Sequence, residues 1–338
     1  MRVLLYVGNY KDVEKSGVGM AIRHQKKAME MVKIPYTTNP NDDYDIVHIN
    51  TIFPESFLFA KKAKAKGKKV VYHAHSTEED FRNSFKLSNS MAPAFKQWLR
   101  LCYKNADLIL TPTPYSKKLL ENYDLGKEIV SISNGIDLQF FKPSLEASKR
   151  FRKKYGFKEN DKVIMSVGLY IERKGILEFL ELAKRMPEYK FIWFGYTAPT
   201  LTPIKINEAI KNKTDNVYFP GYVDSSELKD AYSGADIYIF PTKEETEGIV
   251  LLEALAMRIN TIVSDIPVYD EWLTDGYNVY KAKNVDEFEK KIKGIINGKL
   301  SSVVEQGYKV AEERDIKKIG YQLKKIYEKV MESNLTKN

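Results

Sequence analysis

The chain has 338 residues, of which 43% are hydrophobic and 29% charged, and its net charge is +9. This length predicts two domains, because one hydrophobic core stops growing well below it, and no apolar stretch approaches the length of a membrane span. The single cysteine, Cys102, excludes an intramolecular disulfide and a multi-cysteine metal site, and the four histidines lack the close spacing of a zinc site.

The positive charge is concentrated in the first half of the chain. Residues 1–150 hold 24 Lys and Arg against 16 Asp and Glu, whereas residues 151–338 hold 30 against 29. A basic half favours an anionic partner, such as acidic lipid, phosphate or nucleic acid, although a merely solubilising surface has the same composition. Because no nucleic-acid recognition motif accompanies the charge, we expect no nucleic-acid partner.

Residues 1–150 alternate apolar runs with helical segments, and we interpret them as the first domain. The opening run, Met1-Arg-Val-Leu-Leu-Tyr-Val-Gly8, turns polar too soon for a signal peptide and predicts a strand. The alternation predicts a parallel sheet with helices on both faces. The expected strands are 3–7, 46–49, 70–73, 108–110 and 129–132, and the expected helices are 19–32, 54–66, 93–104 and 116–122.

Two glycines follow the first expected strand, in Ser16-Gly-Val-Gly19. Gly17 and Gly19 would let the backbone wrap around an anion at the start of the next helix, although a plain tight turn has the same pattern. The full dinucleotide fingerprint is missing, and no acidic residue ends a strand about 20 residues later. This disfavours a nicotinamide-dependent dehydrogenase.

Two histidines lie at the carboxyl end of the strand expected at 70–73, a position where parallel sheets bind ligands. His73 and His75 are two residues apart, so both would face the same side of an extended segment. His75 is the candidate ligand contact. A histidine that merely caps a loop is the alternative.

The segment 81–104 mixes aromatic residues with cations and follows the lysine-rich run 61–69. Such a helix can lie in a membrane interface, with tryptophan at headgroup depth and the cations on anionic lipid. A helix that turns its apolar side to the core explains the pattern equally well. The candidate contacts for a lipid acceptor and membrane are Phe81, Arg82, Phe85, Phe95, Trp98 and Arg100.

The second half begins another alternating series after residues 143–160, which we interpret as a linker region. Expected strands are 163–167, 191–194, 217–219, 237–240 and 261–263, and expected helices begin near 175 and cover 226–232, 249–257 and 267–273. The tail from 286 is expected to be helical. We assign residues 151–317 to a second domain, with a helix at about 318–338 packing back on the first. Two such domains predict an active site in the cleft between them.

Two cations and two glutamates mark the candidate chemistry of the second domain. Arg173 and Lys174 lie in a loop between a strand and a helix, where adjacent cations suit a diphosphate and could stabilise it as a leaving group. The stretch Glu245-Thr-Glu-Gly-Ile-Val-Leu-Leu-Glu253 reads as a loop that enters a helix, and the amides of Gly248, Ile249 and Val250 would face an anion. Solvated cations and an ordinary helix with an acidic first turn are the alternatives.

These segments resemble the retaining, nucleotide-sugar-dependent glycosyltransferases of family 4. The similarity rests on the Glu245-x7-Glu253 spacing, on Val167-Gly-Leu-Tyr-Ile-Glu-Arg-Lys-Gly175 and on Ser133-Asn-Gly-Ile-Asp137. It extends over nearly the whole chain and implies the GT-B fold, in which two Rossmann-like, doubly wound α/β domains face each other across a cleft. Lys174 matches the family lysine. Leu169 stands where family members carry arginine, and Arg173 is the candidate substitute.

The resemblance implies a hexosyltransferase with UDP-galactose or UDP-glucose as its donor, and neither a cofactor nor an essential metal. It implies catalytic roles for His75, Arg173, Lys174 and Glu245. It also implies that the donor is bound by Gly17, Gly19, Arg173, Lys174, Glu245, Gly248, Ile249, Val250 and Glu253.

A narrower similarity, carried by His73-Ala-His-Ser-Thr-Glu-Glu-Asp80 and Glu244-Glu-Thr-Glu-Gly-Ile-Val250, is to glycolipid synthases of Gram-positive bacteria. They add a second sugar to monoglucosyldiacylglycerol and supply lipoteichoic acid anchors. The implied enzyme transfers an α-hexose to a membrane glycolipid, giving a dihexosyldiacylglycerol, at the anionic cytoplasmic face of the cell membrane. The alternatives are a family 4 enzyme with another lipid-linked or polysaccharide acceptor, a UDP-sugar epimerase of similar fold, and a non-catalytic binding module.

Overall fold

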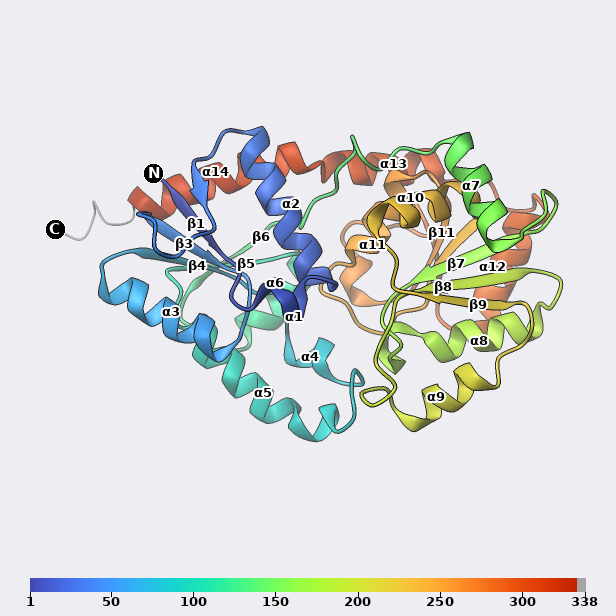
Figure 1. Cartoon of the computed structure of the whole chain (residues 1–338), viewed down its shortest axis with the longest axis horizontal. Coiled ribbons are helices and arrows are strands. Elements are labelled where there is room, and N and C mark those ends of the chain that lie inside the picture. Colours follow the sequence, from blue (N-terminus) through green and yellow to red (C-terminus); the bar gives the residue numbers. More distant parts are fainter. Residues whose placement is uncertain (333–338) are drawn as a thin grey trace.

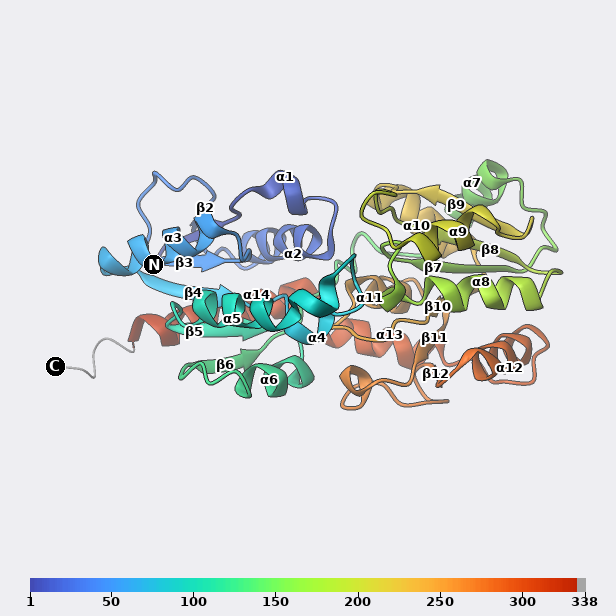
Figure 2. The same ribbon diagram turned by 90° about the horizontal axis from the view of Figure 1, so that it is seen from below.

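The computed structural model describes residues 1–332. They form two parallel β-sheets of six strands each, and the domains built on these sheets lie side by side along the long axis of the molecule (Figure 1 and Figure 2). This architecture confirms the predicted fold of two doubly wound α/β domains. No helix within the described residues is both long and apolar enough to span a bilayer.

The first sheet has the order β2-β1-β3-β4-β5-β6. Its strands are β1 (Val3–Tyr6), β2 (Tyr36–Thr37), β3 (Ile46–Ile49), β4 (Lys69–His73), β5 (Leu108–Thr111) and β6 (Glu128–Ser131). The central strands are buried because helices cover both faces of the sheet, although β3 and β4 also carry His48 and His73. The helices of this domain are α1 (Tyr10–Val13), α2 (Gly17–Met31), α3 (Pro54–Ala65), α4 (Glu78–Phe81), α5 (Ser88–Tyr103) and α6 (Pro114–Glu121).

The second sheet has the order β12-β11-β10-β7-β8-β9. Its strands are β7 (Val163–Val167), β8 (Lys190–Phe194), β9 (Val217–Gly221), β10 (Ile237–Phe240), β11 (Asn260–Ser264) and β12 (Tyr280–Ala282). The other elements are α7 (Leu145–Tyr155), the 3-10 turn η1 (Glu172–Lys174), α8 (Ile176–Arg185), α9 (Ile204–Lys211), α10 (Ser225–Gly234), α11 (Ile249–Ala256), η2 (Pro267–Tyr269), α12 (Val285–Ile296), α13 (Val304–Glu313) and α14 (Ile316–Glu332).

The chain order reverses once in each sheet, between β1 and β3 and between β7 and β10. In open parallel sheets, ligands bind outside the carboxyl ends of the strands at such a reversal. In the second sheet, the loops that leave β7 and β10 are residues 168–175 and 241–248. Both predicted cations and the first predicted glutamate lie in these two loops.

The last helix returns from the second domain to the first. In Figure 1, α13 lies on the second domain, whereas α14 runs along the first beside α2. Gly320 permits this close approach, since a Cβ there would lie 2.7 Å from the Ala28 carbonyl oxygen. Near the end of α14, the Tyr327 hydroxyl lies 2.6 Å from His48 Nδ1. The final residues of the helix expected at 318–338, namely 333–338, are outside the described residues.

The structure differs from the sequence interpretation at residues 143–160, which contain helix α7 rather than a linker. Phe151 on α7 is buried, and it packs so closely against α10 that a Cβ at Gly234 would lie 2.4 Å from its ring. Residues 145–150 therefore pack with the second domain, on the far side of the boundary predicted at residue 150. The short apolar stripe of α7 is obscured in the sequence by Lys and Arg on its solvent side.

Smaller differences concern short elements. The helix expected at 267–273 is only the turn η2, and the tail expected to be helical divides into α12, α13 and α14. The sequence pattern did not predict α1, β2, α4, α9 or β12. Each has eight residues or fewer, too short for a clear hydrophobic period.

Candidate active site

The loops that leave β7 and β10 are pressed directly against each other. The turn η1, which carries Arg173 and Lys174, ends at Gly175, whose φ is +79°. A Cβ at Gly175 would lie 2.0 Å from the Pro241 carbonyl oxygen, so only glycine fits there. The Arg173 carbonyl oxygen accepts a bond of 2.7 Å from the Lys243 amide, which fixes the position of one loop on the other.

Both cations converge on the carboxylate of Glu245. Lys174 Nζ forms an ion pair with Glu245 Oε1, and Arg173 Nη1 lies 3.9 Å from the same oxygen. The Thr242 hydroxyl donates to it at 3.0 Å. The side chains of Arg173, Lys174 and Glu245 are only 12%, 15% and 7% exposed. The site thus concentrates two positive charges in a place that is largely shielded from water.

Burial and charge act in opposite directions on this cluster. Burial lowers the pKa of Lys174, and the attraction of Glu245 only partly offsets that effect. For Glu245, burial would raise the pKa, but the attraction of Lys174 and Arg173 outweighs it and the pKa falls below its ordinary value. The carboxylate is therefore ionised and its pairing with Lys174 is maintained at neutral pH.

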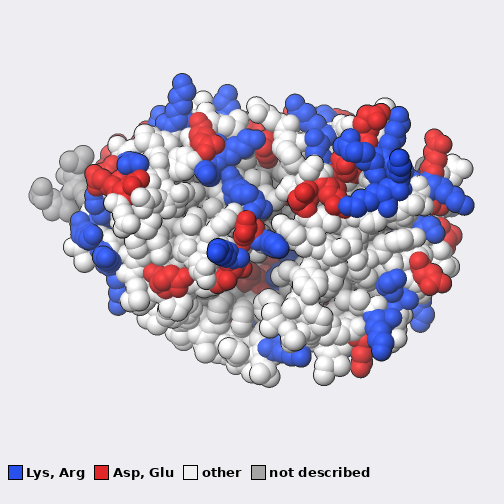
Figure 3. Space-filling model, in the orientation of Figure 1, with Lys and Arg blue, Asp and Glu red and all other residues white. Residues whose placement is uncertain are grey.

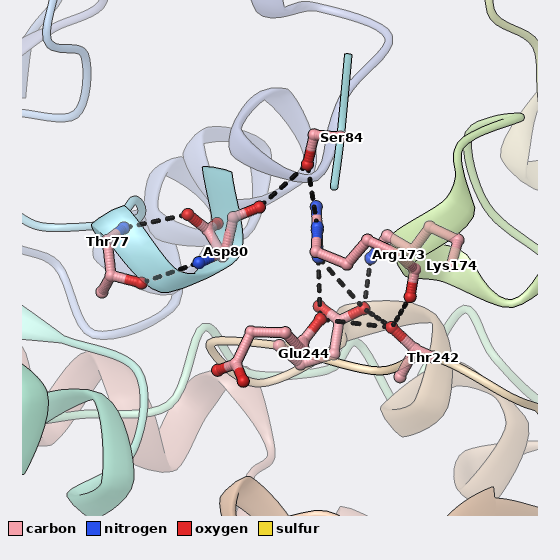
Figure 4. A network of polar contacts seen from close by, with 8 residues as sticks. Thr77, Asp80, Ser84, Arg173, Lys174, Thr242 and Glu244 are labelled. Carbon is pink, nitrogen blue, oxygen red and sulfur yellow. Dashed lines mark hydrogen bonds and ion pairs between the residues drawn. The ribbon is translucent and has the colours of Figure 1, made fainter. Parts of the chain in front are cut away.

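Arg173 also joins the two domains. Its Nε donates to Ser84 Oγ at 3.0 Å, and its backbone amide donates to the Asn83 carbonyl oxygen at 3.1 Å. Figure 4 shows Arg173 between Ser84, which belongs to the first domain, and the backbone of Glu244, whose carbonyl oxygen accepts from Nη1 at 2.8 Å. Arg173 is thus held by both walls of the cleft, whereas Lys174 pairs with Glu245 of its own domain.

Asp80 approaches the same cluster from the first domain and was not predicted. It is half-buried, and burial raises its pKa to about 6, with partial relief from the charge of Arg173. Thr77 and Asp80 form a capping box at the start of α4, and the Ser84 hydroxyl donates to the Asp80 carbonyl oxygen at 2.9 Å. The Thr-x-x-Asp spacing predicts the cap. Only the fold brings this carboxyl group near Arg173.

The backbone amides at the start of α11 are not capped by a side chain of the described residues. Gly248 precedes the helix with φ of +91°, and a Cβ there would lie 2.9 Å from the Phe240 ring. The amides of Ile249 and Val250 at the first turn therefore form a potential site for an anion.

Glu253 lies one turn further along α11 and is 1% exposed. Its Oε2 accepts a hydrogen bond of 3.2 Å from the Tyr232 hydroxyl. Burial raises the pKa of Glu253 to about 8, and the Tyr232 bond and the charge of Arg23 reduce the shift only in part. The second glutamate of the motif is therefore largely protonated at neutral pH while no ligand is bound.

This protonation predicts a pH dependence of stability. Between about pH 4.5, the ordinary pKa, and about pH 8, the folded protein holds a proton on Glu253 that the unfolded chain has released. The contribution of Glu253 to the free energy of unfolding is therefore complete below this window and declines as the pH rises through it. We expect Glu253→Gln to flatten the decline in urea unfolding measured at pH 5, 6.5 and 8.

The matched control is Glu208→Gln on α9, because the Glu208 side chain is exposed and forms no hydrogen bond or ion pair in the described part of the chain. It should leave the pH profile unchanged. Equal slopes in the Glu253→Gln variant and the unmodified protein would contradict the assignment.

His75 belongs to a stack of three histidine rings at the carboxyl ends of β3 and β4. Its ring lies 4.1 Å from that of His73, as expected for two side chains on one side of a strand, and His48 stacks on His73 at 5.4 Å. His75 Nε2 lies 2.8 Å from Asn50 Oδ1. Burial lowers the pKa of both His75 and His48 to about 3, so these rings are neutral at physiological pH.

The two early glycines differ in their surroundings. A Cβ at Gly19 would lie 2.3 Å from the Val13 carbonyl oxygen, so this glycine is needed for the packing of α2 on the preceding loop. Nothing lies within 4 Å of the corresponding position at Gly17. Ser16 caps the helix by accepting a bond of 3.4 Å from the Gly19 amide. The packing of α2 on the preceding segment therefore explains why position 19 is a glycine.

The six candidate acceptor residues do not share one exposed face. Phe81 and Phe95 stack on each other at 4.1 Å, and Trp98 Nε1 donates to the Ile52 carbonyl oxygen at 2.7 Å. Both arginines are paired. Arg82 contacts Glu78 at 2.6 Å, and Arg100 lies 4.0 Å from Asp124. Phe85 differs from the other aromatics because it is 38% exposed.

A buried glutamate that was not predicted links the domains. Glu247 is completely buried, and its Oε2 accepts bonds from the Asn134 amide at 3.0 Å and from Asn134 Nδ2 at 2.8 Å. The Thr113 hydroxyl donates to the Thr246 carbonyl oxygen at 2.8 Å. The Asn-Gly-Ile-Asp segment therefore meets the Glu-x7-Glu loop directly, although the two are far apart in the sequence.

Comparisons with known proteins agree with this architecture. Residues 147–313 match the family described as "Glycosyl transferases group 1", and residues 34–140 match "Glycosyltransferase Family 4". A processive diacylglycerol alpha-glucosyltransferase of Acholeplasma laidlawii is 45% identical over 98% of this chain and 99% of its own. An alpha-galactosylglucosyldiacylglycerol synthase of Streptococcus pneumoniae is 24% identical over 71% of this chain and 66% of its own.

The fold comparison gives the same architecture. The crystal structure of Anabaena HepE in complex with UDP-glucose superimposes with a TM-score of 0.77 over 97% of this chain and 100% of that one, at 17% sequence identity. Among residues 1–332, no group of three or more His, Cys, Asp or Glu side chains is arranged to hold a metal ion.

Proposed function

Since the chain belongs to the family 4 glycosyltransferases and is a hexosyltransferase, we propose that it moves glucose from UDP-glucose to a diacylglycerol glycolipid with retention of the α configuration. The acceptor would be monoglucosyldiacylglycerol and the product a diglucosyldiacylglycerol. The observation that carries the choice of glucose and of a diacylglycerol-based acceptor is the 45% identity to a processive diacylglycerol alpha-glucosyltransferase over almost the full length of both chains. Galactose remains the second donor to test.

The buried cluster of Arg173, Lys174 and Glu245 supports the transfer step. As the bond between the anomeric carbon and the phosphate oxygen breaks, negative charge develops on the departing UDP. Arg173 and Lys174 would stabilise that charge in surroundings where water is largely excluded. The acceptor hydroxyl attacks the anomeric carbon from the face that UDP leaves, and its proton passes to the leaving phosphate oxygen.

The remaining residues would bind and orient the donor. In this proposal, Glu245 accepts hydrogen bonds from the hexose hydroxyls, and the amides at Gly248, Ile249 and Val250 bind the phosphates. The carboxyl group of Glu253 accepts hydrogen bonds from the ribose hydroxyls. His75 is neutral, so it would orient the sugar by hydrogen bonding rather than act as a cationic acid. Gly17 lies at the start of α2, where the backbone could approach the diphosphate.

The acceptor places the enzyme at a membrane. A glycolipid substrate stays in its bilayer, and the excess of Lys and Arg in residues 1–150 suits the anionic inner face of a cell membrane. We therefore propose a protein that works from the cytoplasm and binds this surface peripherally.

The test is a transfer assay with the purified chain. We expect liposomes that contain monoglucosyldiacylglycerol to yield a dihexosyl lipid with UDP-glucose, identified by mass spectrometry, and an α linkage in its NMR spectrum. UDP-galactose is the parallel donor, and diacylglycerol without sugar is the parallel acceptor. A folded protein that forms no dihexosyl lipid with either donor would refute the proposal.

A further inference from the structure

An apolar rim built from both domains borders one opening of the cleft. We define it by five exposed side chains, three from the loop before α5 and its first turn and two from the segment that enters α9: Phe85, Leu87, Met91, Leu201 and Ile204. Leu87 and Ile204 are 74% and 66% exposed. Figure 1 and Figure 2 place α5 and α9 at the same edge of the molecule, and this lower edge in Figure 3 carries few charged side chains.

A pocket of about 130 Å³ lies between the two halves of the apolar rim. Its apolar lining is Phe85, Leu87 and Pro203. Its polar lining is Asn83, Ser88, Asn89 and Glu172. The pocket adjoins the cation cluster, because the Asn83 carbonyl oxygen accepts from the Arg173 amide and Glu172 precedes Arg173 in the same turn. The pocket thus combines apolar and polar lining residues close to the reacting groups.

The loop before α5 is built to hold Leu87 outward. Asn83 and Leu87 have φ of +56° and +65°, in the left-handed region of backbone conformation that residues other than glycine seldom adopt. Asn83 and Asn89 exchange two hydrogen bonds, of 2.9 and 2.8 Å. The Ser84 amide donates to Ser88 Oγ at 3.3 Å. These bonds hold the Leu87 side chain in solvent. A large apolar side chain that the backbone holds in solvent is typical of a surface that contacts a partner.

The charges beside the apolar rim indicate the chemistry of that partner. Lys86 precedes Leu87 and Lys205 follows Ile204, and both lysines are exposed. Neither forms an ion pair or hydrogen bond within the part of the chain that the structure describes. Apolar side chains that insert between acyl chains, flanked by free ammonium groups at headgroup level, suit a bilayer that contains anionic lipid.

We propose that both domains dock on the membrane through the apolar rim, and that the pocket between them receives the sugar headgroup of the acceptor glycolipid. The occupant is an anionic bilayer that bears this lipid. Insertion of Leu87 from the first domain and Ile204 from the second places the acyl chains at the entrance. The sugar then lies over Asn83, Asn89 and Glu172, with its hydroxyl toward Arg173. This inference rests on the proposed function, since a lipid-linked acceptor is assumed.

The single buried cysteine makes a direct test possible. Burial raises the pKa of the Cys102 thiol to about 11, so a cysteine introduced at the surface can be labelled selectively. We would attach an environment-sensitive fluorophore at Leu87→Cys, Ile204→Cys and, as control, Leu145→Cys. Leu145 is 82% exposed on α7, at the opposite edge in Figure 1. With vesicles of phosphatidylglycerol and monoglucosyldiacylglycerol, emission should shift to the blue at the first two positions only.

A second measurement does not depend on labels. In co-sedimentation with the same vesicles, the double variant L201S/I204S should bind about tenfold more weakly than the unmodified protein, whereas L145S should bind equally. A response at Leu87→Cys alone, together with unchanged binding of L201S/I204S, would overturn the two-domain contact. Equal blue shifts at all three labelled positions would overturn the apolar rim as the docking surface.

The outcomes separate this inference from the proposed function. If the labels respond as expected but no dihexosyl lipid forms in the transfer assay, the docking surface stands and the reaction is wrong. If lipid product forms but neither Leu87→Cys nor Ile204→Cys responds, the reaction stands and the docking surface is wrong.

Discussion

Lys174→Ala is expected to lower kcat by roughly 10²–10³-fold, the range seen when one preorganised group that stabilises transition-state charge is removed. Lys174 contacts Glu245 inside the cleft, and the charge on the departing UDP appears only as the bond to the sugar breaks. The loss should therefore fall on kcat more than on KM for the donor. Steady-state kinetics with UDP-glucose and the glycolipid would measure both.

The fold should survive this substitution. Glu245 retains the Thr242 hydroxyl at 3.0 Å and Arg173 at 3.9 Å, so its charge is not left unpaired. The matched control is Lys184→Ala on α8, because the Lys184 side chain is exposed and forms no hydrogen bond or ion pair within the described residues. A kcat of Lys174→Ala within a few fold of the control would remove Lys174 from the mechanism.

Gly175→Ala is expected to lower the free energy of unfolding by about 3 kcal/mol or more. The new Cβ would be strained by the positive φ and would also overpack against the neighbouring loop. The new methyl group would lie 2.0 Å from the Pro241 carbonyl oxygen, and a backbone atom cannot turn aside as a side chain can. Since Gly175 follows Lys174, the shift should also misplace both cations and reduce turnover. Urea unfolding and the transfer assay would measure the two effects.

Gly156→Ala isolates the contribution of the clash. Gly156 has a similar φ of +70°, but nothing lies within 4 Å of its Cβ position. We expect this control to cost about 1 kcal/mol and to leave turnover unchanged. If both variants lost the same stability, the contact between the β7 and β10 loops would not be the reason for glycine at position 175.

The sequence was a good guide wherever a local pattern determines structure. Apolar runs such as 163–167 and 237–240 are strands because helices cover both faces of the sheet, and the histidines two residues apart do share one side of the chain. The Arg-Lys and Glu-x7-Glu segments lie on adjacent loops because strand order reverses between β7 and β10. Here the fold class and the location of the cations followed from pattern and resemblance together.

The parts that were missed depend on contacts between distant segments. Nothing near Asp80 in the sequence indicates that it approaches Arg173, and nothing near Glu247 indicates that it binds Asn134. The sequence around Trp98 fits a membrane interface as well as it fits a protein core. In the structure the indole N–H of Trp98 donates to the Ile52 carbonyl oxygen, a contact that the sequence does not indicate. In α7, the many charged residues on the solvent side obscured the few apolar residues that pack on α10, so the sequence did not indicate a helix there.

The return of α14 to the first domain has a consequence for biosynthesis. Helix α14 contributes Ile319, Leu323, Tyr327 and Val330 to the same apolar cluster as Val3, Leu5 and Met29. The part of this cluster that α14 covers, beside β1 and α2, therefore stays open until α14 has left the ribosome. The first domain should remain open and susceptible to proteases throughout translation, and ribosome-bound chains that stop before residue 316 should be cleaved within residues 1–140 even after the second domain has folded.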